Sequence, residues 1–264
     1  MKEKVLMGRK SIHYRNPYQS EFVQKLDSLC TIKSLWQVWS DFVAMASLSI
    51  ANALDRTSKT HDVREEEYLA ITRGYSTGEL TTFAELLSIL VLALEENPEQ
   101  DFLGELFSSL NLMSHWKGQF FTPYHIGRLM STIGIEQCKE GILENGWTSI
   151  TDPCCGAGSL LIAMRNEMVR QGFNSQQALY VAQDIDRTTA MMCFLQLSLL
   201  GCAGYVVVGN SLTHPVVSST GSPLLIAPLE DQEVWIMPAL YDKIWHCRMQ
   251  FEKLRLLIEG ETRR

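Results

Sequence analysis

A turn between a β-prone stretch and a helical stretch carries the residue types best suited to holding a ligand. Asp152 follows the short stretch 147–150, and Gly156 and Gly158 come next, before a helical pattern that starts at Ser159. Glycines let the backbone approach a ligand where a Cβ would clash, and the free N–H groups of a helix N-terminus would point at it. The layout of strand, acidic residue, glycine turn and helix therefore predicts a pocket for a nucleotide-like ligand.

The spacing of the glycines speaks against the two commonest nucleotide signatures. The dinucleotide fingerprint needs a third glycine where Leu161 stands, and no Gly-Lys-Ser/Thr follows as in a Walker phosphate loop. What remains is Asp-Pro-x-x-Gly-x-Gly, from Asp152 to Gly158. This string resembles the first motif of S-adenosyl-L-methionine (AdoMet)-dependent N6-adenine DNA methyltransferases, and most of all the modification subunits of type I restriction systems.

Three further strings, in the same order as in that family, support the resemblance. Gly118–Pro123 is similar to the family's Gly-Gln-Phe-Tyr-Thr-Pro, and Tyr180–Asp186 resembles its second strand with an acidic end. Val206–Leu212 resembles the third strand, which usually ends in Gly-Asp-x-Leu. The resemblance covers roughly residues 101–212 and implies a Rossmann-like methyltransferase domain with AdoMet as its cofactor.

Upstream of the turn, the resemblance implies contacts to the methionine part of AdoMet. Phe121, Thr122 and Pro123 would lie beside it, and Thr122 would bond its carboxylate. The alternative is a plain helix start, with Thr122 as the N-cap and Pro123 at the first helical position.

Within the turn, the resemblance implies that Asp152 accepts a charge-assisted hydrogen bond from the ammonium group of AdoMet. Asp152 could also cap the following helix, and the two roles do not exclude each other. Pro153 belongs to the same motif, and Gly156 and Gly158 would allow the backbone to approach the cofactor.

The adenosine part would lie at the ends of the second and third strands. Asp184 would take both ribose hydroxyls, as the acidic residue of dinucleotide folds does, with Asp186 as the fallback or as a helix cap. Ile185 would cover one face of the adenine. Asn210 stands where the family usually has Asp, so it would accept from the adenine amino group or be a simple turn residue.

The motif on which the family's chemistry depends, Asn/Asp-Pro-Pro-Tyr/Phe after the fourth strand, has no intact counterpart. In the family it holds a flipped adenine in line with the methyl group, so positioning is most of the catalysis. The best candidate follows the β-prone stretch Glu233–Met237: Met237 stands in place of Asn, Pro238 follows it, and Tyr241 is the aromatic residue. We therefore predict no catalytic residue and describe this string as degenerate.

Composition limits the partners. The net charge is −7 and the sequence pI is about 5.4, whereas proteins that hold DNA alone usually present a basic surface. DNA remains a candidate partner, together with a second protein or another copy of the chain. The basic amino-terminal residues predict a solvated tail or a contacting arm; they are Lys2, Lys4, Arg9, Lys10 and Arg15.

The cysteines and apolar stretches indicate where the protein works. Seven cysteines at irregular spacing favour a reducing cytoplasm over a disulfide framework. Cys154 and Cys155 are adjacent and lack a second pair, so we expect no metal site. The longest apolar stretch, Leu86–Leu94, is too short to span a bilayer, and we expect no membrane contact.

The fold class we predict is α/β: a helical bundle followed by a Rossmann-like sheet that is shortened to four strands. Helical spacing predicts about five helices in a domain at residues 1–114, one of them opening at a Thr82-x-x-Glu85 capping box. The methyltransferase-like domain would occupy residues 115–264, with strand order 3-2-1-4 and helices on both faces. We interpret Asn16-Pro17 as a turn and helix start.

Three hypotheses follow. The chain is an adenine DNA methyltransferase that needs a second subunit, or a non-catalytic relative that keeps the AdoMet pocket and acts in regulation or assembly. In the third, the pocket is vestigial and the protein is a scaffold.

Overall fold

The computed structural model describes residues 14, 16–56, 59–112, 120–216, 222–226, 228–229 and 232–262. The basic residues near the amino terminus, Gly118 and Gln119 lie outside the described residues, as does the predicted domain boundary at 114. That boundary stays a prediction.

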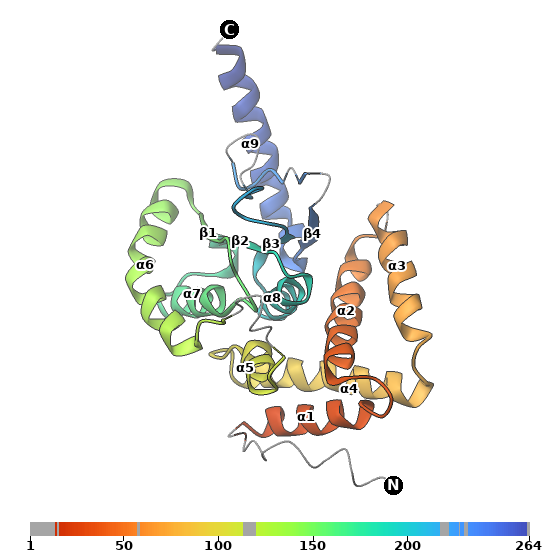
Figure 1. The fold of residues 1–264 in the computed structure, drawn as a ribbon. Helices are drawn as coiled ribbons and strands as arrows, with labels where there is room; N and C mark the ends of the chain where they lie inside the picture. The colour runs from red at the N-terminus through yellow and green to blue at the C-terminus, as the bar shows by residue number, and fades with distance from the viewer. Residues whose placement is uncertain are drawn as a thin grey trace.

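Helices make up the described amino-terminal part of the molecule (Figure 1). They are α1 (Pro17–Leu29), α2 (Leu35–Leu54), α3 (Lys59–Thr72), α4 (Thr77–Glu96) and α5 (Phe102–Ser109). Aromatic rings pack them together: the centroid of Phe22 lies 5.2 Å from that of Phe42 and 5.6 Å from that of Phe102, both edge-on. The side chain of Asn16 accepts from Tyr18 N–H at 2.9 Å, so Asn16-Pro17 is a helix start, as predicted.

The capping box predicted at Thr82 and Glu85 was wrong. α4 begins six residues earlier, where Ser76 and Glu79 exchange side-chain and backbone hydrogen bonds. Thr82 lies inside the helix, and its hydroxyl donates to the Gly78 carbonyl at 3.2 Å. Both strings fit the pattern, but a capping box forms only where the chain leaves a non-helical conformation.

By length and composition alone, α4 could cross a membrane. In this structure 33% of its most apolar window is buried, and the side chains of Leu86, Leu90 and Leu94 belong to the core. A core helix passes the same test of length and composition, so this is weak evidence for a membrane span.

A mixed sheet follows the helices. Its strands are β1 (Thr148–Asp152), β2 (Ala178–Asp184), β3 (Ala203–Val208) and β4 (Glu233–Ile236). They lie in the order β1-β2-β3-β4, the first three parallel and β4 antiparallel to β3. The predicted order 3-2-1-4 was therefore wrong.

The connection between β3 and β4 explains the difference. A parallel neighbour needs a crossover, usually a helix, that returns the chain to the other end of the sheet. Among its described residues, the connection 209–232 contains no helix, and Gln232 Nε2 donates to the His214 carbonyl at 2.9 Å, so the chain is back at the carboxyl end of β3 when β4 begins. Glu233 consequently pairs with Val208, and β4 runs back along β3.

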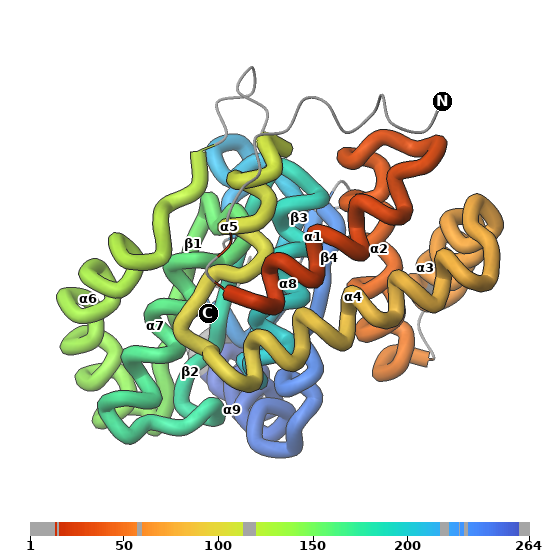
Figure 2. Tube along the Cα trace, turned by 90° about the horizontal axis from the view of Figure 1, so that it is seen from below, coloured from red at the N-terminus to blue at the C-terminus, as the bar shows by residue number. Residues whose placement is uncertain are grey.

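Helices cover one face of the sheet (Figures 1 and 2). They are α6 (Tyr124–Asn145), α7 (Ser159–Arg170) and α8 (Arg187–Leu199). α8 lies between the sheet and the amino-terminal helices, since it contacts α2, α4 and α5 as well as β2 and β3. The buried hydrophobic core therefore runs without a break from α1 to the sheet.

The opposite face is covered by the carboxyl-terminal elements. These are the short helix η3 (Pro238–Tyr241) and α9 (Lys243–Thr262); another short helix, η2 (Ser175–Gln177), precedes β2. Leu240 and Trp245 pack against Leu179, Val181 and Tyr205 of the sheet in a second, smaller cluster. Beyond that cluster α9 projects from the rest of the molecule (Figure 1).

Candidate functional site

A small cavity lies at the carboxyl end of β1, between the glycine turn, the segment 120–122 and the start of α5. Its volume is about 310 Å³, including space that is open to solvent. It is lined by Asp101, Phe120, Phe121, Thr122, Asp152, Cys154, Cys155, Gly156, Ala157, Ser159 and Leu160. None of these lining residues carries a positive charge.

The glycine turn is held in one shape by its neighbours. Gly156 and Gly158 have φ values of 52° and 97°, in the region that side chains with a Cβ rarely adopt. A Cβ on Gly158 would lie 3.0 Å from Cys193 Sγ, and one on Gly156 would lie 3.2 Å from the ring of Phe121. Both glycines are therefore required by backbone conformation and by space.

Asp152 brings an unpaired carboxylate oxygen to the cavity. Its Oδ1 accepts from Cys154 N–H at 3.0 Å, while its buried Oδ2 has no hydrogen-bond partner among the described residues. Burial raises the pKa of this carboxyl group, and the nearby Asp184 adds to the effect. A buried acceptor without a partner is costly, so this oxygen is suited to a cationic donor.

The alternative role of Asp152 as a helix cap was wrong. The N-cap of α7 is Gly158, and no side chain caps this helix end. The hydroxyl oxygen of Ser159, the first residue of α7, is buried and also lacks a partner within the described part of the chain. The amino end of α7 therefore presents hydrogen-bond donors to the cavity that Asp152 also lines.

Thr122 lines the cavity and does not cap α6. The N-cap of α6 is Pro123, whose carbonyl accepts from Ile126 N–H at 2.9 Å, and the helix begins at Tyr124. The predicted helix start was thus one residue early, and a half-buried Thr122 hydroxyl lies at the cavity instead. Phe121 stacks on Phe107 of α5, with ring centroids 5.6 Å apart and planes inclined by 20°.

Asp184 supports the glycine turn. Its Oδ2 accepts from Gly156 N–H at 2.8 Å, and its Oδ1 accepts from Asp186 N–H at 2.9 Å and from the Thr189 hydroxyl at 3.0 Å. Asp186 caps α8, since its side chain accepts from Thr189 N–H at 3.1 Å. A ribose contact by Asp184 stays a prediction and would require some of these hydrogen bonds to be shared.

Several predicted residues lie outside the cavity. They are Pro123, Pro153, Gly158, Asp184, Ile185 and Asn210. The side chain of Ile185 is 69% exposed at the end of β2. The Asn210 side-chain oxygen accepts from Leu212 N–H at 2.9 Å, as expected of a turn residue, so its contact with adenine stays a prediction.

The degenerate string lies at the other end of the sheet. β4 runs antiparallel to β3, and Met237 N–H donates to the Gly204 carbonyl at 2.9 Å, beside the amino end of β3. Pro238 and Tyr241 follow in η3, also at that end. Met237, Pro238 and Tyr241 are therefore remote from the cavity, which lies at the carboxyl end of β1.

The cysteines are all free, and Cys154 and Cys155 belong to the turn. Among the residues that the structure describes, no group of three or more His, Cys, Asp and Glu side chains comes together as a metal site would require.

Asp101 is a cavity residue that sequence reasoning missed. It is the N-cap of α5, and its Oδ1 accepts from Gly104 N–H at 2.9 Å and from Gln196 Nε2 at 2.8 Å. The only local signal is the Asp-x-x-Gly spacing ahead of an apolar helix, which predicts a cap but not a ligand contact. Ser159 was missed for the same reason, because its position beside the cavity depends on the tertiary fold.

A family model described as N-6 DNA methylase matches residues 98–231, slightly more than half of the chain. The comparison with curated proteins found no match.

Among solved structures, a chain described as a class I S-adenosylmethionine-dependent methyltransferase from Listeria monocytogenes is similar, with a TM-score of 0.41 and 14% sequence identity. The match covers 76% of this chain and 55% of that one, so the chain spans little more than half of that protein's length. A likeness at this level carries no argument about the site.

Proposed function

Because the chain belongs to the N-6 DNA methylase family, we propose that its cavity binds the methionine end of AdoMet. That end carries an ammonium and a carboxylate group. The unpaired Oδ2 of Asp152 suits the ammonium group, while the Ser159 hydroxyl, the amino end of α7 and Thr122 suit the carboxylate. The unpaired Asp152 oxygen is the observation that carries the proposal.

The adenosine part would extend from the cavity along the carboxyl ends of β2 and β3. This direction leads past Asp184 and Ile185 toward Asn210, the residues predicted for ribose and adenine. In open α/β sheets, ligands bind outside the carboxyl ends of the strands. Asp184 also braces the glycine turn, so we expect its loss to affect the turn and the cofactor together.

The reaction we propose is transfer of the AdoMet methyl group to N6 of adenine in DNA, together with a partner subunit, as in the modification subunits of type I restriction systems. The sequence contains no Asn-Pro-Pro-Tyr string, and its nearest counterpart at Met237 is remote from the cavity. The residues that orient the base would therefore come from the partner. β1 bonds to β2 on one side only among the described strands, so its other edge could pair with a partner strand or a second copy.

The second candidate is a non-catalytic relative that binds AdoMet and acts in regulation or assembly. The position of Met237, Pro238 and Tyr241 at the opposite end of the sheet favours this reading for the chain acting alone. In this case the cofactor would bind without any methyl transfer.

Calorimetric titration with AdoMet tests the cofactor proposal. We expect the unmodified protein to bind and Asp152→Asn to bind about tenfold to a hundredfold more weakly, because a hydrogen bond to a charged group is worth roughly 1.5–3 kcal/mol. Asp62→Asn is the matched control, since this carboxylate on α3 is exposed and distant in the fold. Equal affinities for the unmodified protein and Asp152→Asn would remove this carboxylate from the site.

A methyl-transfer assay shows whether the chain by itself transfers the methyl group. Labelled AdoMet is incubated with duplex DNA and the chain alone, and the mass of the chain is followed by light scattering. Methylated adenine would establish the enzyme. Cofactor binding without transfer would support dependence on a partner or the non-catalytic function, and no binding at all would leave the scaffold hypothesis.

A further inference from the structure

The amino-terminal helices contribute a buried carboxylate to the cavity. Asp101 precedes α5 and is 3% exposed, yet it lines the same cavity as Asp152. Its two hydrogen bonds are both made by Oδ1, from Gly104 N–H and from Gln196 Nε2. Within the described part of the chain, the hydrogen bonds of this carboxylate go to Oδ1 and leave Oδ2 as an acceptor.

Gln196 connects Asp101 to the glycine turn. Its side chain is fully buried in α8, and its amide nitrogen donates to Asp101 Oδ1 at 2.8 Å and to the Ala157 carbonyl at 2.9 Å. Its amide oxygen accepts from Leu103 N–H at 3.0 Å. One side chain thus uses both the nitrogen and the oxygen of its amide group to hold the start of α5 against the turn.

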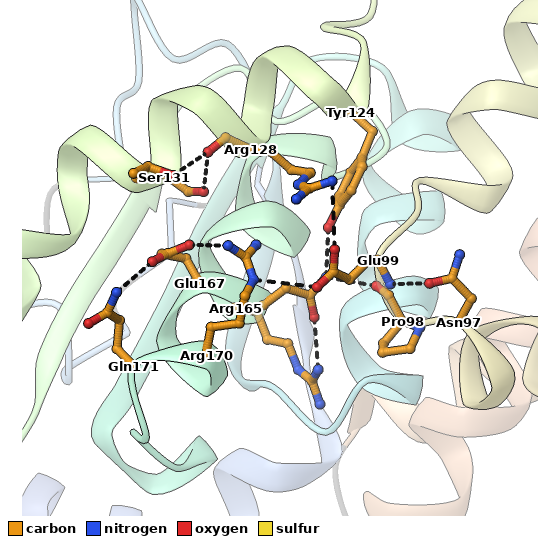
Figure 3. Close-up of polar contacts among 12 residues, drawn as sticks. Asn97, Pro98, Glu99, Tyr124, Arg128, Ser131, Arg165, Glu167, Arg170 and Gln171 are labelled. Carbon is orange, nitrogen blue, oxygen red and sulfur yellow. Dashed lines mark hydrogen bonds and ion pairs between the residues drawn. The ribbon is translucent and has the colours of Figure 1, made fainter.

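A second set of contacts holds the chain just before Asp101 (Figure 3). Asn166 of α7 is buried, and its side chain donates to the Pro98 carbonyl at 2.7 Å and to the Tyr124 hydroxyl at 2.8 Å. Glu99 forms ion pairs with Arg170 at 3.4 Å and with Arg128 at 3.9 Å. The connection between α4 and α5 is therefore anchored to α6 and α7.

We propose that Asp101 is a cofactor-binding residue, whose Oδ2 accepts from the ammonium group of AdoMet beside the unpaired oxygen of Asp152. The α4–α5 connection is then part of the cofactor site. This inference rests on the proposed function, since it takes AdoMet to be the ligand of the cavity. The cavity holds two carboxylates and no positive charge among its lining residues, so a cation is the group it lacks.

The protonation behaviour of Asp101 agrees with this geometry. Burial raises its pKa to about 6, although the hydrogen bonds from Gln196 and Gly104 act in the opposite direction. Glu105 on the same helix raises the pKa further. A cationic ligand beside Asp101 would offset the cost of the buried charge.

Asp101→Asn tests the inference, because an amide oxygen can still accept from Gly104 and Gln196. Three ligands are titrated at pH 8: AdoMet, S-adenosylhomocysteine, which keeps the ammonium group, and 5′-methylthioadenosine, which lacks the whole amino-acid end. We expect about tenfold to a hundredfold weaker binding of the first two and unchanged binding of the third. Glu105→Gln removes a neighbouring carboxylate that does not line the cavity, and it should leave all three affinities unchanged.

The outcomes separate this inference from the proposed function. If the unmodified protein does not bind AdoMet, both are wrong. If it binds, but Asp101→Asn weakens all three ligands equally or none of them, only the role of Asp101 is overturned. Circular dichroism and a thermal melt of each variant exclude unfolding as the cause of weaker binding.

Discussion

At the scale of single residues, the molecule keeps buried charge where no internal partner neutralises it. Asp101 and Asp152 line one cavity, and burial raises the pKa of both carboxyl groups. The other buried acidic residues of the described chain are paired: Asp41 accepts from Gln37 and Tyr75, and Glu167 accepts from Arg170 and Gln171. Uncompensated burial of this kind is typical of ligand sites, where a bound group completes the pairing.

The pH dependence of stability should reveal Asp101. Its pKa is about 6 in the folded protein against an ordinary value of 3.8, so between these values the folded state binds a proton that the unfolded state does not. Stability from this group therefore falls as the pH rises through that window, by at most about 3 kcal/mol. Asp101→Asn removes the titration.

Thermal melts of the protein without cofactor check this expectation. We compare the melting temperature of Asp101→Asn with that of the unmodified protein at each pH. The difference in favour of the variant should be larger at pH 7.5 than at pH 4, because only the unmodified protein buries a charge at the higher pH. The same variant is expected to bind AdoMet more weakly. A difference in melting temperature that does not change with pH would contradict a buried, titrating Asp101.

At the scale of elements, the glycine turn depends on its surroundings as much as on its own sequence. The turn is supported from α8 through Gln196 and from β2 through Asp184. Phe121 lies against Gly156 and stacks on Phe107 of α5. These contacts hold the turn in place beneath the predicted cofactor before any ligand arrives, which lowers the entropic cost of binding.

Gly158→Ala should destabilise the turn by more than the positive φ of residue 158 alone would cause. The added Cβ would lie 3.0 Å from Cys193 Sγ, and the residue has a φ of 97°. We expect a loss of about 2–3 kcal/mol of unfolding free energy together with weaker AdoMet binding.

Gly172→Ala is the matched control, because its φ is 84° and an added Cβ would meet nothing within 4 Å. It should cost about 1 kcal/mol and leave AdoMet binding intact. Chemical denaturation and calorimetry measure the two effects. If both variants lose stability and AdoMet binding equally, the contact of the added Cβ with Cys193 contributes nothing to the effect of Gly158→Ala.

At the scale of the whole molecule, Arg187 ties together three parts of the chain. At the start of α8, its guanidinium pairs with Glu67 of α3 at 2.8 Å and with Glu233 of β4 at 2.7 Å. The two carboxylates raise the pKa of Arg187, although burial opposes them. This clamp joins α3, α8 and β4.

Arg187→Met should destabilise the protein by about 1–2 kcal/mol, a modest value because the side chain is 37% exposed and solvent screens the pairs. Arg255→Met breaks an exposed pair within α9 and should cost less than about 0.5 kcal/mol. Urea denaturation compares the two. Adding Glu67→Gln to Arg187→Met should restore part of the loss, since it removes a carboxylate left facing Glu233, and no restoration would argue against the clamp.

The sequence by itself determined the local features of this protein. The helices, the parallel strands β1 to β3 and the glycine turn after Asp152 follow from spacing and from residue types at neighbouring positions. Such patterns act over one turn of a helix or one strand, so they can be recognised without the fold. Their limit was the exact start of a helix, whose N-cap lay one residue after Thr122 in α6 and six residues before Thr82 in α4.

Only the tertiary structure determined which segments, distant in the sequence, are neighbours in the fold. It placed β4 antiparallel to β3, because the chain returns without a crossover, and so carried Met237 away from the cavity. It also brought Asp101 to the cavity, through Gln196, which lies 95 positions further along the chain. Contacts over such separations depend on how helices and sheet pack together, and no local pattern in the sequence records them.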